Sequence, residues 1–158
     1  MRVMGPLAIA PYTADREADL VAMWRESFEA GVGVIDPHPF SEQVAYFRAQ
    51  VLPRCDVCVA LEGDRLVGFI AATPSRIEQL YVRVGMHRRG IGTALLAWAQ
   101  ARSSGTLRLY TFARNRVACA FYEWHGFVVE RRGFEPQWQL DDVLYRWERG
   151  LRTNRDLL

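Results

Sequence analysis

The spacing of hydrophobic residues in the first third of the chain predicts one strand and two helices. Residues 7–12 have strand-like spacing, and a stripe of large apolar residues at 20–28 predicts a helix that Asp15 caps. Two prolines place a loop at residues 34–40, and a second helix is expected over residues 41–52. Both helices therefore precede the main run of strands.

The rest of the chain predicts six strands and two more helices. Short apolar runs are separated by turn residues, and two longer segments have helical spacing. Residues 62–65 form the turn of a hairpin of the longer-loop kind. The expected strands are 57–61, 66–73, 77–82, 107–112, 127–131 and 143–147, and the expected helices are 91–102 and 116–124. The order of elements is thus β-α-α-β-β-β-α-β-α-β-β.

Length and composition place these elements in one domain. The chain has 158 residues, of which 50% are hydrophobic and 24% are charged. This is enough for one buried core but short for two domains. We expect a single domain over residues 1–150 and a tail at 151–158. Because no apolar run is long enough to cross a bilayer, a cytoplasmic protein without membrane contact is expected.

Charge and cysteine content exclude two classes of function. All 20 basic residues are arginine, but 18 acidic residues leave a net charge of only +2, which argues against nucleic-acid binding. Cys55 and Cys58 have no second pair that would complete a metal site. In a strand their thiols would point to opposite faces, so we interpret both as packing residues and expect no metal. Cys119 is interpreted as a small apolar residue.

Residues 77–93 have the build of an anion site. They read I-E-Q-L-Y-V-R-V-G-M-H-R-R-G-I-G-T, a strand that breaks into a glycine and arginine turn and then opens a helix. Gly90 and Gly92 leave main-chain N–H groups uncovered, and the helix adds unpaired donors and the positive end of its dipole. The sequence has no G-K-[ST] motif and no lysine, which excludes a P-loop nucleotide site.

Two motifs in order carry a resemblance to a known family. The first is L-Y-V-x(7)-G-I-G-x-x-L-L at residues 80–96, and the second is N-x(6)-Y-x(3)-G-F at residues 115–127. With the order of elements, they resemble the GNAT superfamily of CoA-dependent N-acyltransferases over nearly the whole chain. The resemblance implies an α/β fold of the mixed α+β kind. Its central, mostly antiparallel sheet would be flanked by about four helices, and two central strands would splay apart.

The resemblance also implies acetyl-CoA as the acyl donor. The turn would hold the pyrophosphate, and the main chain of two strand residues would pair with the pantetheine arm. His87 stands where the family usually has Gln or Arg, and it is either a phosphate contact or an exposed turn residue. Asn115 is a helix cap, a contact to CoA, or both. The residues expected to bind the cofactor are Leu80, Val82, His87, Arg88, Arg89, Gly90, Ile91, Gly92, Thr93, Asn115 and Tyr122.

The implied reaction needs an acid and a base. A neutral amine attacks the thioester carbonyl, and the departing thiolate takes up a proton. Tyr122 occupies the position of the family's tyrosine general acid; the alternative is an aromatic core residue beside Phe121. Glu78 is the candidate general base, which would accept the ammonium proton directly or through water; the alternative is a surface or cap-like glutamate. Asp141 and Asp142 are rivals that would hold a cationic amine, and as strand neighbours only one of them should face the cleft.

Recognition of the acceptor is expected from the loop at residues 31–40 and the connection at residues 133–140. The expected acceptor contacts are Trp24, Phe28, His38, Trp138 and Asp142, with Asp36, Phe40 and Phe134 around them. The sequence therefore predicts an N-acetyltransferase, monomeric or homodimeric, in which a primary amine of a small molecule or peptide attacks acetyl-CoA directly in a ternary complex. The alternative is a catalytically silent domain that binds acetyl-CoA as a sensor or interaction partner.

Overall fold

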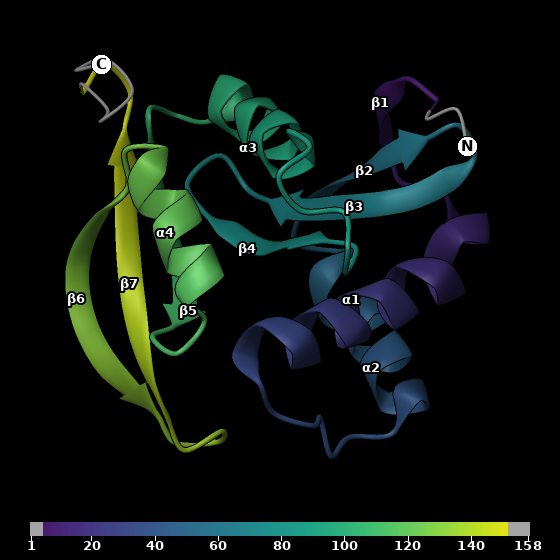
Figure 1. The fold of residues 1–158 in the computed structure, drawn as a ribbon, viewed down its shortest axis with the longest axis horizontal. Helices are drawn as coiled ribbons and strands as arrows, with labels where there is room; N and C mark the ends of the chain where they lie inside the picture. Colours follow the sequence, from purple (N-terminus) through teal and green to yellow (C-terminus); the bar gives the residue numbers. More distant parts are fainter. Residues whose placement is uncertain (1–4, 152–158) are drawn as a thin grey trace.

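The structure is a computed structural model that describes residues 5–151; the expected tail lies, from residue 152 on, outside the described residues. Within them, helices and strands follow one another in the predicted order (Figure 1). The strands are β1 (Leu7–Pro11), β2 (Asp56–Glu62), β3 (Arg65–Ala72), β4 (Ile77–Val82), β5 (Thr106–Phe112), β6 (Val128–Glu135) and β7 (Leu140–Glu148). The helices are α1 (Glu17–Val32), α2 (Phe40–Tyr46), α3 (Ile91–Arg102) and α4 (Arg116–Trp124), with a 3-10 turn at Ala14–Arg16 and a π-helical turn at Phe47–Val51.

The strands form two antiparallel sheets. The first has the order β1-β2-β3-β4 and the second the order β5-β7-β6. Helices α1 and α2 lie on one side of the first sheet, α3 packs on the other, and α4 lies next to the second sheet (Figure 1). The expected mixed α/β fold with antiparallel strands and four helices is confirmed for the described residues.

Strands β4 and β5 are parallel neighbours that are joined at one end. Among the described residues, a single parallel bridge links Arg76 to Arg108, and the Arg108 N–H donates to the Ser75 carbonyl at 3.1 Å. From there toward Val82 and Phe112 the two strands belong to different sheets. The splay that the family resemblance implies is therefore confirmed. We call the gap between the unpaired ends of β4 and β5 the splay.

The free edge of β4 presents peptide groups to the splay. The Arg83 N–H donates to the Val67 carbonyl of β3 at 2.8 Å. Since the residues of an antiparallel strand alternate in direction, Leu80 and Val82 direct their main-chain groups away from β3. The Val82 carbonyl accepts a hydrogen bond from Ser27 Oγ of α1 at 2.9 Å. These are the two residues whose main chain was expected to pair with the pantetheine arm.

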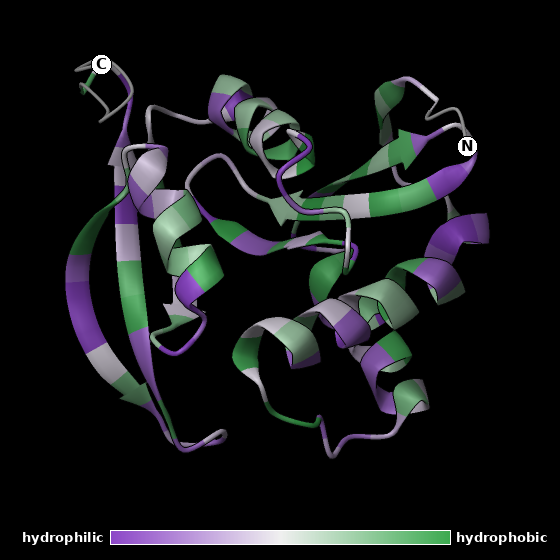
Figure 2. Cartoon of the chain, in the orientation of Figure 1, coloured by the Kyte–Doolittle hydropathy of each residue, from purple (hydrophilic) through white to green (hydrophobic). Residues whose placement is uncertain are grey.

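Two buried clusters hold the layers together. The first lies between the sheets and helices α3 and α4 and includes Val67, Ile70 and Leu95. The second lies under α1 and α2 and includes Leu20 and Phe69. Strand β3 supplies alternate residues to both clusters, and seven of its eight residues are buried. Figure 2 shows the hydrophobic run along this strand.

The last hairpin is longer than the sequence predicts. The connection expected at residues 133–140 is reduced to a turn at residues 136–139, because β6 continues to Glu135 and β7 begins at Leu140. Gly133 pairs with Asp142 in the ladder. Pairing with a long neighbouring strand therefore outweighs the weak strand propensity of glycine.

Two expectations about turns are wrong. Glu62 pairs with Arg65, so the β2–β3 hairpin has a two-residue turn and not a longer loop. Asp15 does not cap α1, because a 3-10 turn precedes the helix. Its carboxylate is instead hydrogen-bonded to Thr13, and this bond lowers the pKa of Asp15.

The cysteines pack as expected. Cys58 is buried in the cluster on the α3 side, whereas Cys55 packs against the cluster under α1, so the two thiols point to opposite faces. Burial raises the pKa of both thiols. Cys119 is partly buried against the α3-side cluster.

The substitution Gly68→Ala should destabilise the protein by overpacking β3 against α3. A Cβ atom on Gly68 would lie 3.0 Å from Leu95 Cδ1, 3.0 Å from the Tyr81 carbonyl oxygen and 3.1 Å from Ile91 Cγ2. Because the Tyr81 carbonyl belongs to the sheet, we expect the free energy of unfolding in urea to fall by about 1–3 kcal/mol. Ala97 is exposed on α3, and Ala97→Ser should change stability by less than about 0.5 kcal/mol. Equal stability of Gly68→Ala and wild type would contradict this packing.

Candidate functional site

The turn between β4 and α3 has the backbone shape of an anion site. Arg88 and Gly90 have φ values of 64° and 78°, and α3 starts directly after Gly90. The Ala94 N–H donates to the Gly90 carbonyl at 3.0 Å. The N–H groups of residues 91–93 therefore have no acceptor carbonyl within the helix. They point outward from the start of α3, where the helix dipole has its positive end.

Basic side chains surround this turn. His87, Arg88 and Arg89 are exposed, and the Arg89 guanidinium lies 3.9 Å from the Glu62 carboxylate. Exposed cations beside a helix start add to its positive potential. The exposure of His87 agrees with both of its interpretations, as a phosphate contact and as a turn residue.

The first turn of α3 is fixed against the end of α4. A Cβ atom on Gly92 would lie 3.2 Å from the Phe121 ring, so the absence of a side chain lets the two helices approach. The Thr93 hydroxyl oxygen lies 3.1 Å from Nε2 of His125, which is buried. The rings of Phe121 and His125 are in contact, with centroids 4.6 Å apart. We call these four residues the α3–α4 junction.

Tyr122 lies within the core beside this junction. It is 6% exposed, and its ring centroid is 5.5 Å from that of Phe127 and 6.0 Å from that of Tyr145. Burial raises the pKa of the Tyr122 phenol far above its ordinary value, and the neighbouring Tyr81 raises it further. The core interpretation is confirmed. It is compatible with acid catalysis, because a phenol with a raised pKa keeps its proton at neutral pH.

Asn115 is the N-cap of α4. Its Oδ1 accepts a hydrogen bond from the Ala118 N–H at 3.2 Å, which confirms the cap interpretation. The Asn115 amide also lies close to α1, since a Cβ atom on Gly31 would be 2.9 Å from its Nδ2. Asn115 therefore joins α4 to α1 just after β5 ends.

Glu78 lies toward the closed end of the splay. Its carboxylate is 3.1 Å from the Arg76 guanidinium, and its side chain is 42% exposed. Arg76 is the residue that bridges to β5. The Glu78 carboxylate is thus held in an ion pair near the closed end, which weakens its case as general base.

The aromatic residues expected at the acceptor end come together only in part. Phe28 packs on Trp138 of the β6–β7 turn, with ring centroids 5.1 Å apart, and on Phe112 at 6.2 Å. The His38 ring lies 5.8 Å from Trp138. Trp24 is different, because it is 7% exposed and packs on Phe69 in the core under α1.

The loop between α1 and α2 is fixed by hydrogen bonds. The Arg25 guanidinium donates to the Asp36 carbonyl at 2.8 Å and to the His38 carbonyl. The Asp36 carboxylate accepts the His38 main-chain N–H at 2.9 Å and lies 2.7 Å from its Nδ1. His38 therefore faces Trp138 from a loop held on α1.

Asp142 lines a small pocket at the open end of β5. The pocket has a volume of about 300 Å³, and its lining residues are Ala113, Arg132, Gly133, Asp141 and Asp142. Both aspartates contribute to the lining, and the expectation that only one of their side chains faces the cleft stays a prediction. The Asp141 carbonyl accepts the Ala113 N–H at 2.9 Å, and a Cβ atom on Gly133 would lie 2.8 Å from Asp142 Oδ1, so the two residues reach the pocket from different directions.

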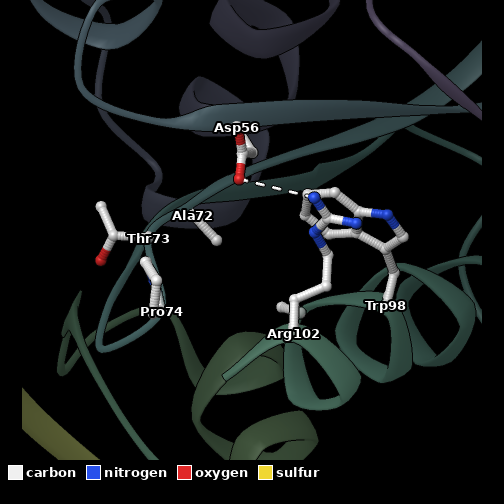
Figure 3. Close-up of a pocket in the computed structure, with 7 residues that line it drawn as sticks. Asp56, Ala72, Thr73, Pro74, Trp98 and Arg102 are labelled. Carbon is white, nitrogen blue, oxygen red and sulfur yellow. Dashed lines mark ion pairs between the residues drawn. The ribbon is translucent and has the colours of Figure 1, made fainter. Parts of the chain in front are cut away.

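A larger pocket, of about 350 Å³, lies at the other end of α3. Figure 3 shows Arg102 stacked over Trp98, with its guanidinium 4.8 Å from the ring centroid and 3.7 Å from the Asp56 carboxylate. Helix α3 has 12 residues and is therefore about 18 Å long. This pocket is thus separate from the anion turn at the start of the helix.

Residues 5–151 lack two features, a membrane-spanning helix and a metal-binding cluster. No helix there is long and apolar enough to span a membrane. No group of three or more His, Cys, Asp or Glu side chains there is placed to hold a metal ion.

Comparison with known proteins identifies the family and the fold. Residues 53–129 match the family described as the acetyltransferase (GNAT) domain. Residues 53–129 of this chain therefore carry a GNAT acetyltransferase domain. Peptidyl-lysine N-acetyltransferase YiaC of Escherichia coli (strain K12) is 26% identical over 129 residues, which cover 81% of this chain and 88% of YiaC. Peptidyl-lysine N-acetyltransferase YjaB of Salmonella typhimurium is 26% identical over 125 residues, which cover 78% of this chain and 81% of YjaB.

Solved GNAT structures have the same fold. The apo form of YjaB from Escherichia coli superposes with a TM-score of 0.73 at 21% identity, over 90% of this chain and 97% of YjaB. PaiA N-acetyltransferase from Thermoplasma acidophilum, in complex with coenzyme A, gives 0.72 at 18% identity, over 90% of this chain and 99% of PaiA. The chain is thus of the acetyl-CoA-dependent acyltransferase class, as predicted.

The residues present fit acetyl-CoA. A pyrophosphate needs N–H donors, which residues 91–93 supply at the start of α3. An amide-rich pantetheine arm needs peptide groups that are not bonded to a neighbouring strand, which the edge of β4 supplies at Leu80 and Val82. The side chains of these two residues pack against the core, so only their main chain is available for this purpose.

The sequence analysis missed Ser27 and His125. Ser27 is 8% exposed on the apolar face of α1, and a serine at such a position signals a buried hydrogen bond. His125 lies inside the second motif, between Tyr122 and Gly126, and was not singled out. No sequence pattern indicates that the His125 ring contacts Thr93, because the two residues are 32 positions apart.

The substitution Asn115→Ala should destabilise the protein through loss of the α4 cap. We expect the free energy of unfolding to fall by about 0.5–2 kcal/mol, because the Ala118 N–H loses its acceptor. Asn115→Ser is the matched control, since serine also caps helices, and it should retain most of the stability. Urea denaturation measures both variants. If the two variants lose equal stability, the cap is not the stabilising contact.

Proposed function

We propose that this GNAT domain transfers the acetyl group from acetyl-CoA to a primary amine by direct attack in a ternary complex. One observation carries the proposal, which is that the splay between β4 and β5 leads into the anion turn at the start of α3. A donor that carries a pantetheine arm next to a pyrophosphate matches these two features in the same order. The main chain of Leu80 and Val82 would hold the arm, and residues 91–93 would hold the phosphates.

Tyr122 is proposed as the general acid for the departing thiolate. Its buried phenol has a raised pKa and keeps its proton until the carbon–sulfur bond breaks. Its position on α4, next to the α3–α4 junction, supports this role.

For the acceptor amine we propose Asp142 in preference to Glu78. Glu78 is paired with Arg76 at the closed end of the splay. Asp142 lines the pocket next to Ala113, at the open end, where a carboxylate attracts an ammonium group and can take up its proton. Glu78 as general base stays a prediction.

The proposed acceptor class is a lysine side chain of a peptide or protein. Two relatives at 26% identity are named peptidyl-lysine N-acetyltransferases. Two exposed aromatic residues in the segments expected to bind the acceptor, Phe40 at 43% and Phe134 at 55%, support a surface on which a peptide can lie. A small-molecule amine is the alternative. A cytoplasmic location and a monomeric or homodimeric state stay predictions.

Acetyl transfer is tested by following thiol release from acetyl-CoA with lysine-containing peptides and, separately, small amines. We expect acetylated lysine by mass spectrometry and release of one thiol per acetyl group transferred. If CoA binds but no amine raises thiol release, the domain is a silent acetyl-CoA sensor. If CoA does not raise the melting temperature, the proposed cofactor site is wrong.

The role of Tyr122 predicts a specific kinetic change. Tyr122→Phe should lower kcat by about 100-fold or more, because the leaving thiolate loses its proton donor, and should leave the Kd for CoA nearly unchanged. Tyr110→Phe is the control, since Tyr110 is 46% exposed on β5; its kcat should equal that of wild type. Equal kcat values for Tyr122→Phe and wild type would remove Tyr122 from the mechanism.

A further inference from the structure

The α3–α4 junction contains a buried histidine that the proposed mechanism does not use. His125 follows the last residue of α4 and is 8% exposed. Its main-chain N–H donates to the carbonyls of Phe121 and Tyr122 at 3.2 and 3.1 Å. These bonds fix the backbone of His125, and contact with the Phe121 ring at 4.6 Å fixes its imidazole. The orientation of the ring is therefore set by α4.

The partner of this imidazole lies in the anion turn. Nε2 of His125 is 3.1 Å from Oγ1 of Thr93, which is the third residue of α3. Thr93 is one of the three residues whose N–H groups have no helical acceptor. The hydroxyl that His125 touches is thus at the place where a phosphate would bind.

The direction of this hydrogen bond decides what Thr93 can do. A threonine hydroxyl has one hydrogen to donate and accepts through its lone pairs. If Thr93 donates to His125, its only hydrogen is used and its lone pairs repel a phosphate oxygen. If His125 donates from Nε2, the Thr93 hydrogen is free to bond a phosphate oxygen.

We propose that His125 is a positioning residue for the donor's pyrophosphate: its Nε2–H donates to Thr93 Oγ1 and thereby directs the Thr93 hydroxyl hydrogen toward a phosphate oxygen. This inference rests on the proposed binding of acetyl-CoA. His125 does not touch the phosphate itself and acts through Thr93. The close contact of Gly92 with Phe121 keeps the two helices at the distance that this bond requires.

The test compares two ligands that differ in phosphate content. CoA carries the pyrophosphate, and pantetheine carries the same arm and thiol without it. Their dissociation constants are measured by calorimetry for CoA and by ligand-observed NMR for pantetheine. His125→Phe keeps a planar ring without a donor, Thr93→Val keeps the shape without the hydroxyl, and His125→Gln keeps a side-chain N–H.

We expect His125→Phe and Thr93→Val each to raise the Kd for CoA about five- to tenfold, because one hydrogen bond to a charged group is lost. The Kd for pantetheine should change less than about twofold. The double variant should be no weaker than the weaker single variant, since both remove the same bond. His125→Gln should recover affinity to within about threefold of wild type.

Thr106→Val is the matched control, because Thr106 lies at the start of β5 and outside the α3–α4 junction; its Kd for CoA should equal that of wild type. Equal loss of CoA and pantetheine binding in His125→Phe would show a merely structural role and overturn the inference. Unchanged CoA affinity in Thr93→Val, a second variant that does not depend on how His125→Phe folds, would also overturn it. If the wild type binds no CoA, the proposed function fails first.

Discussion

The parallel bridge between Arg76 and Arg108 is the constraint on which the rest of the structure depends. It keeps β4 and β5 together at one end, while β3 and β7 draw them into separate sheets. A fully paired sheet would have bonded the peptide groups of Leu80 and Val82 to β5 and left no edge for a ligand. Unpaired peptide groups are costly when water is excluded. The Ser27 hydroxyl offsets part of this cost by donating to the Val82 carbonyl.

The divergence of β5 also decides how α4 meets α3. The start of α3 touches the end of α4 through two contacts, Gly92 with Phe121 and Thr93 with His125. Opposite ends of two helix dipoles are therefore neighbours, which is a favourable arrangement. Tyr122 lies on α4 directly beside these contacts, so the residue proposed for acid catalysis and the turn proposed for phosphate binding are fixed by one junction.

The elements proposed to bind the donor could be predicted from sequence because their determinants are local. Strand β4, α3 and α4 begin and end where apolar spacing and Gly90 indicate. The acceptor side was predicted less well. A glycine and a proline within residues 133–140 indicate a loop, but pairing with β7 extends β6 to Glu135. Helical spacing predicts that Trp24 is buried. It does not tell whether Trp24 contacts the acceptor, as expected, or packs in the core under α1, as observed. His125 and Ser27 were missed because their bonds span 32 and 55 residues.

Helix α1 connects the two halves of the site. Arg25 holds the loop that carries Asp36 and His38 by donating to both of their main-chain carbonyls. Two residues later, Ser27 donates to Val82 on the strand proposed to hold the donor. The loop proposed to bind the acceptor and the strand proposed to hold the donor are therefore attached to the same helix. Because a rigid helix keeps both surfaces in register, an amine and a thioester bound there are aligned at little further entropic cost.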